Sequence, residues 1–176
     1  MLRVLVVLIL ILTSLPAGNA APRYSAAQAA ALALIDFPWQ QLQYEIVFLP
    51  PRKGFRAMTI AKERRIEVYA RPADDVALLA YDIAHELGHA IDLTRNTSES
   101  RRKWKEFRGI DSATPWFGCD RCSDYNTPAG DFAETFAMFL LGPEHFSGRI
   151  ARRPNTDELQ NLMSFFPKDS FRPQAN

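Results

Sequence analysis

Residues 81 to 95 read YDIAHELGHAIDLTR, and this stretch determines the expected fold. His85 and His89 stand four positions apart, so on a helix their imidazoles lie on one face and can hold one metal ion. Neutral imidazole is a good ligand for zinc, so we expect Zn²⁺ at this position. The chain has three histidines and two of them fall in this motif, which argues against a chance match.

Glu86, beside the first histidine, is expected to act as a base rather than as a ligand. It is too close to the histidines in the sequence to serve as a third ligand on their face. It is placed instead to take a proton from a water molecule on the metal, the role of the glutamate in this motif. Ile83, Leu87 and Ala90 coat the opposite side of the helix, which predicts that the helix is buried.

A third ligand is expected from residues 130 to 137, GDFAETFA. A catalytic zinc site has three protein ligands and an open position, and the third ligand is often a carboxylate. Asp131 and Glu134 are three positions apart and are therefore neighbours on a helix. One would bind zinc and the other would orient a ligand histidine through its second nitrogen, with Asp131 the preferred ligand. The alternative is an ordinary acidic, solvated helix start.

The motif HELGHAID at residues 85 to 92, followed about forty residues later by DFAE, resembles the gluzincin group of zinc metallopeptidases. Within that group it is most similar to the small catalytic domain of the anthrax lethal factor type. The similarity covers residues 81 to 141. It implies a zincin-like metallopeptidase domain, in which a small sheet lies beside the active-site helix and a second helix bears a ligand. It also implies hydrolysis of peptide bonds.

The sequence departs from this family at one position. The family's second helix typically reads Glu-x-Phe-Ala-Glu, with the first Glu on zinc and the second supporting a ligand histidine. Gly130 stands here in place of the first Glu. Asp131 could replace it by a shift of one position, or Glu134 could reach the metal itself. A third interpretation is a degraded site with weak affinity for zinc.

The same resemblance implies a role for Tyr125, which lies shortly before the second helix. Such a tyrosine can donate a hydrogen bond to a developing oxyanion. An aromatic residue packed in a loop is an equally good interpretation. His145 is a rival electrophile or ligand, but a histidine just past Gly142-Pro143 commonly interacts only with the helix end.

Cys119 and Cys122 are the only cysteines. A local disulfide bracing the loop before Tyr125 is the favoured interpretation in an oxidising compartment. A redox-active pair would need a thioredoxin-like setting, and a zinc knuckle would need two further ligands.

The N-terminus predicts export. Residues 1 to 20 have a basic start, an apolar run too short to span a bilayer, and a small-residue end, as in a signal peptide cleaved after Ala20. An uncleaved anchor is the alternative. We therefore expect a secreted or extracytoplasmic domain at residues 21 to 176, without stable membrane association after cleavage. The net charge of +1 argues against nucleic acid as a partner.

Strand-like segments precede helical ones, which predicts a single α+β domain with a small antiparallel or mixed sheet. Strands are expected at 43–49, 54–60 and 65–69, and helices from Ser25, from Asp74, at 98–108, at 131–141 and from Asn155. Residues 66 to 69 could form an edge strand that holds an extended peptide, or an interior strand.

These features together predict a secreted zinc metallopeptidase that acts on a peptide or protein substrate. A zinc-dependent amidase of cell-wall peptides and a catalytically weak zincin-like binding module are the alternatives. The sequence does not indicate the oligomeric state.

Overall fold

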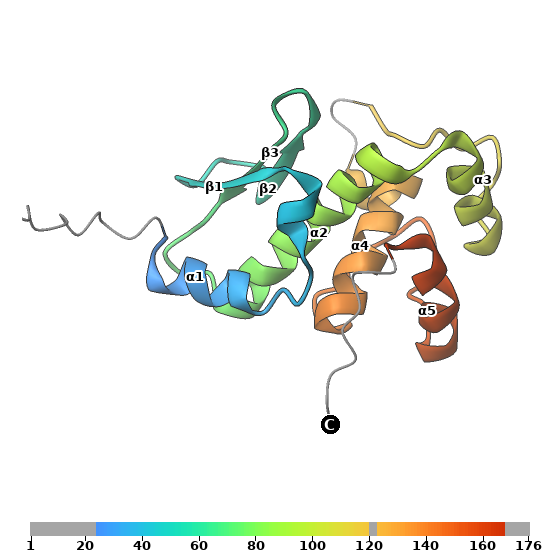
Figure 1. The fold of residues 1–176 in the computed structure, drawn as a ribbon. Helices are drawn as coiled ribbons and strands as arrows, with labels where there is room; N and C mark the ends of the chain where they lie inside the picture. The colour runs from blue at the N-terminus through green and yellow to red at the C-terminus, as the bar shows by residue number, and fades with distance from the viewer. Residues whose placement is uncertain (1–23, 120–122, 168–176) are drawn as a thin grey trace, which may run out of the picture.

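A computed structural model describes residues 24–119 and 123–167, which form an α+β fold (Figure 1). The expected signal peptide lies outside the described residues. Within the described part of the chain, no helix is long and apolar enough to cross a membrane. The helices and strands are α1 (Ala26–Ala33), β1 (Glu45–Leu49), β2 (Ala57–Ile60), β3 (Arg65–Tyr69), α2 (Val76–Arg95), α3 (Ser98–Phe107), α4 (Pro128–Leu141) and α5 (Thr156–Leu162).

The sheet has three strands in the order β1-β3-β2. β1 pairs with β3 in parallel and β2 pairs with β3 in antiparallel, so the expected mixed sheet is confirmed. β3 is the central strand, and its Ile66 and Val68 are fully buried. Of the two interpretations of residues 66 to 69, the interior strand is confirmed and the edge strand is wrong. The hairpin partner β2 and the parallel strand β1 both add to β3, which leaves β2 at an edge.

Helix α2 carries the HELGH motif and lies between the sheet and α4 (Figure 1). It begins after Asp75, whose carboxylate accepts a hydrogen bond from the main-chain N–H of Leu78 at 2.7 Å. Ile83, Leu87 and Ile91 are fully buried, as the apolar spacing predicts. Because α2 is packed between the sheet and α4, the helix that bears the candidate ligands is held in one position.

Helix α4 packs closely against α2 because a glycine stands at the crossing. A Cβ atom at Gly88 would lie only 2.6 Å from the Cα atom of Ala133, so only glycine allows this approach without displacement. The close contact brings residue 134 of α4 next to residue 85 of α2. The glycine inside the HELGH motif therefore has a packing role.

Helix α4 begins three residues earlier than expected. Thr127 is its N-cap and accepts a hydrogen bond from the N–H of Gly130 at 2.9 Å, and Pro128 occupies the first position of the helix. A short 3₁₀ turn, η3 (Asp124–Asn126), directly precedes this cap. The extra helical turn places η3 beside the histidines of α2.

Candidate metal centre

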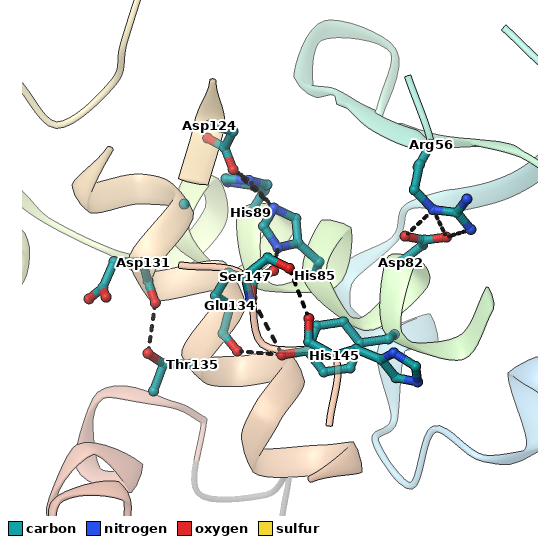
Figure 2. Close-up of polar contacts among 12 residues, drawn as sticks. Arg56, Asp82, His85, His89, Asp124, Asp131, Glu134, Thr135, His145 and Ser147 are labelled. Carbon is teal, nitrogen blue, oxygen red and sulfur yellow. Dashed lines mark hydrogen bonds and ion pairs between the residues drawn. The ribbon is translucent and has the colours of Figure 1, made fainter. Parts of the chain in front are cut away.

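Three possible ligand atoms converge at the junction of α2 and η3 (Figure 2). The Nε2 atoms of His85 and His89 lie 3.2 Å apart. The Oδ2 atom of Asp124 lies 3.0 Å from Nε2 of His85 and 3.1 Å from Nε2 of His89. The spacing of the two histidines on one helical face brings these nitrogens together, and the turn before α4 adds the carboxylate.

The spacing of these atoms fits a small divalent cation. Zinc binds histidine nitrogen and carboxylate oxygen at about 2.0–2.2 Å, so two ligand atoms on a tetrahedron around it lie about 3.3 Å apart. The three distances between the atoms of His85, His89 and Asp124 are 3.2, 3.0 and 3.1 Å. The donor set is also of the kind that zinc takes in hydrolases, with two imidazoles and one carboxylate.

Glu134 supports His85 from the other side of the ring. Its Oε1 atom lies 2.8 Å from Nδ1 of His85, and its Oε2 atom accepts a hydrogen bond from the main-chain N–H of Ser147 at 2.6 Å (Figure 2). A proton on Nδ1 shared with this carboxylate leaves the Nε2 lone pair free to face the cluster. This contact fits the second of the two roles expected for the acids of α4, the orientation of a ligand histidine.

The charges around His85 favour a cation at this position. Burial lowers the pKa of His85, but hydrogen bonds with Asp124 and Glu134 outweigh burial and raise it to about 10. Burial likewise raises the pKa of Asp124, but its contacts with His85 and His89 hold that pKa well below its usual range. Two carboxylates thus stabilise positive charge at the cluster, whether a proton or a metal ion carries it.

Asp124 is held in place by the cap of α4. The hydroxyl of Thr127 lies 2.9 Å from the main-chain oxygen of Asp124 and 3.2 Å from its Oδ1 atom. A Cβ atom at Gly130 would lie 2.7 Å from Oδ2 of Asp124, the atom that faces the histidines. Gly130 thus leaves room for a carboxylate supplied by the preceding turn.

Asp131 lies elsewhere. Its carboxylate is fully buried and accepts hydrogen bonds from Nε1 of Trp104 at 3.0 Å and from Nε and Nη2 of Arg108 at 2.8 and 2.9 Å. Residues three apart still differ by about 60° around a helix axis, so Asp131 faces α3 while Glu134 faces α2. The preferred third ligand of the sequence analysis is therefore not brought to the histidines, and Asp124 takes its place in the candidate set.

Tyr125 lies at the site and His145 lies beside it. The Tyr125 ring is 5.7 Å from the His85 ring, and burial raises the pKa of Tyr125 to about 12, so its hydroxyl stays protonated and can donate. The His145 ring packs on Tyr81, with centroids 5.5 Å apart, and it is not part of the cluster of candidate ligands.

A cleft of about 550 Å³ opens onto the candidate ligands. One wall is α2 and the turn η3, and the other is strand β2 with the residues before it, 54 to 59. Two side-chain contacts along this cleft join α2 to β2 and to the residue directly before it. Arg56 binds Asp82 through Nε and Nη2 at 2.6–3.0 Å (Figure 2), and the Thr59 hydroxyl donates to Glu86. The open side of the cluster therefore faces an edge strand.

Cys119 is disulfide-bonded, in agreement with the favoured interpretation of the cysteine pair. Cys122 lies outside the described residues.

Comparisons of the chain with protein-family models, curated proteins and solved structures found no match.

Asp124 and Thr59 were not among the site residues predicted from the sequence. For Asp124, a usable signal was the pair Thr127-Pro128, which is typical of a helix start and places an acid three residues before the cap. For Thr59 no local signal exists, because its partner Glu86 is 27 residues away.

Proposed function

We propose that this protein is a zincin-like zinc metallopeptidase, with His85, His89 and Asp124 as the ligands. The observation that carries the proposal is the convergence of three ligand atoms within 3.0–3.2 Å of one another, beside the glutamate of the motif and in the lining of an open cleft. A zinc ion held there would supply Lewis acidity, which polarises a carbonyl group and lowers the pKa of water.

The protein's own groups perform the proton transfers. Glu86 accepts the proton of the attacking water and passes it to the leaving amine. The Tyr125 hydroxyl, neutral because its pKa is raised to about 12, donates a hydrogen bond to the oxyanion that develops at the scissile carbonyl. Glu134 keeps the His85 ring in one orientation and one tautomer through the contact at Nδ1.

Strand β2 is the proposed binding edge for an extended peptide. The N–H of Tyr69 donates to the carbonyl of Arg56, so residues 56, 58 and 60 are the ones that bond to β3. The main-chain groups of Ala57 and Thr59 therefore point to the free edge, which lines the cleft. A peptide added there would receive main-chain hydrogen bonds that do not depend on its sequence.

The rim of the cleft supports a peptide as the substrate. Phe55, Leu93 and Phe117 line the cleft and are 40–47% exposed, although large apolar side chains are usually buried. They can contact apolar side chains of a chain bound in the cleft. A substrate of this kind is an unfolded protein or an extended peptide.

The test is hydrolysis of an unfolded protein by the zinc-loaded chain and by Glu86→Gln. We expect wild type to cleave, a chelator to stop cleavage, and added zinc to restore it. Glu86→Gln should bind zinc as wild type does and lose hydrolysis. Full activity of this variant would contradict the assigned base. Cleavage of cell-wall peptides without cleavage of protein would instead identify an amidase, and zinc binding without any hydrolysis would identify a binding module.

A further inference from the structure

We propose that Thr59 is a positioning residue that holds the general base Glu86 from the substrate-binding strand. This inference rests on the proposed function and assigns a role to a residue outside the HELGH motif. It concerns the one side-chain hydrogen bond by which β2, the free edge of the sheet, contacts the acid that would transfer protons.

The contact is short and specific. The Thr59 hydroxyl lies 2.7 Å from Oε2 of Glu86 and 3.0 Å from the main-chain oxygen of the same residue. Both oxygens can only accept, so Thr59 must be the donor, and its single hydrogen goes mainly to the nearer, charged oxygen. Glu86 is itself 8% exposed, so little water competes for this contact.

The hydrogen bond gives the two carboxylate oxygens of Glu86 different roles. Oε2 is occupied by Thr59, which leaves Oε1 for the proton of the attacking water. A glutamate side chain has three rotatable bonds. Without a hydrogen-bond partner it samples several rotamers, and only some of them place the carboxylate where it can accept the proton. Thr59 selects one rotamer before the substrate arrives.

The position of Thr59 links this contact to substrate binding. Its main-chain groups point to the free edge of β2, while its side chain reaches α2. Thr59 would thus contact an added peptide through its main chain and the base Glu86 through its side chain. The strand order makes this arrangement specific to β2, because β3 is buried in the middle of the sheet.

If Thr59 served only to hold β2 against α2, loss of its hydroxyl would affect folding rather than catalysis. Arg56, directly before β2, contacts Asp82 in α2 and, at 3.2 Å, Asp74 just before α2, so charged groups already hold the start of the strand against this helix. Loss of one hydroxyl should therefore leave the strand in place. Its effect should appear in the catalytic step rather than in folding or in zinc binding.

The experiment compares Thr59→Val, which keeps the shape and removes the hydroxyl, with Thr59→Ser, which keeps the hydroxyl. We expect Thr59→Val to lower kcat roughly 10- to 100-fold with KM within about twofold of wild type, and Thr59→Ser to restore most of kcat. Zinc affinity should not change in either variant. Thr94→Val is the matched control, because its hydroxyl contacts only carbonyl oxygens of its own helix, Ala90 and Ile91.

A second measurement does not depend on activity. Crystal structures of the zinc-loaded proteins should show Glu86 displaced or in several rotamers in Thr59→Val, and in its wild-type position in Thr59→Ser. If wild type proves inactive, the proposed function fails, and these structures still decide the role of Thr59. Unchanged kcat in Thr59→Val, no rescue by Thr59→Ser, or an unmoved Glu86 would overturn the inference. If Thr59→Val does not fold, Thr59→Ala replaces it, since a smaller side chain creates no clash.

Discussion

Gly130 packs so closely against Asp124 that a Cβ atom at position 130 would lie 2.2 Å from the main-chain oxygen of Asp124. No side chain fits at that distance. The first turn of α4 can therefore carry no side chain at this position as long as the η3 turn supplies its carboxylate to the two histidines.

Gly130→Ala should weaken zinc binding, because the new methyl group must displace Asp124 from the histidines. We expect the affinity for zinc to fall roughly 10- to 100-fold, the size of effect typical when the support of a ligand is lost. Competition with a chromogenic chelator measures this. Ala129→Gly is the control, since it changes the same helical turn without adding an atom near Asp124. Equal zinc affinity in Gly130→Ala and wild type would show that Asp124 does not depend on this space.

Glu134→Ala should also weaken zinc binding roughly 10- to 100-fold, because His85 loses the partner of its Nδ1 atom. Glu134→Gln should have a smaller effect, since one amide oxygen can still accept from either His85 or the N–H of Ser147. Calorimetric titration of the metal-free proteins with zinc gives both affinities. Complete loss of zinc in Glu134→Ala with no loss in Asp124→Ala would mean that Glu134 reaches the metal itself.

Asp131→Ala should destabilise the fold without removing zinc from the molecules that remain folded. The carboxylate is fully buried against Arg108, whose side chain is 4% exposed, and its loss leaves this buried guanidinium without its carboxylate partner, although the main-chain oxygen of Arg152 still accepts from Nη2. Removing one partner of a buried ion pair costs about 3–5 kcal/mol. Urea unfolding in the presence of a chelator measures the stability, and zinc content of the folded fraction measures the site. A stable variant that has lost zinc would return Asp131 to the ligand set.

Tyr125→Phe should lower kcat while zinc content and stability stay near those of wild type. The loss of one preorganised oxyanion donor costs roughly 10²- to 10³-fold in rate. Steady-state kinetics on a cleaved peptide identifies the effect. Retention of wild-type kcat would favour the other interpretation, in which Tyr125 only packs against the ring of His85.

Most of the fold follows from local features of the sequence. Ser25, Asp75 and Asn155 each accept a hydrogen bond from the N–H three residues later, and each of the three helices begins directly after its cap. The strand order does not follow from such features. β2 and β3 form a hairpin, and local features do not show which of the two strands lies at the edge of the sheet. β3 is the central strand because it also pairs with β1, whose residues lie twenty positions earlier in the chain than their partners.

The candidate site likewise contains residues that local sequence features predict and residues that they do not. His85, Glu86 and His89 are placed by helix geometry alone, so a spacing of four residues is enough to predict their common location. Asp124 was missed because the start of α4 was expected three residues too late, which put the acid in an irregular loop. Asp131 and Glu134 were correctly expected on one helix, but which neighbour each one faces depends on how α4 packs between α2 and α3.

The zinc content of Asp124→Ala tests the central claim most directly. Purified wild type should hold about one zinc ion per chain, as a site with two histidines and a carboxylate does. Asp124→Ala should remain folded and lose most of this zinc, whereas the folded fraction of Asp131→Ala should keep it. Full zinc occupancy in Asp124→Ala, or a wild-type protein that binds no zinc in titration, would contradict the account.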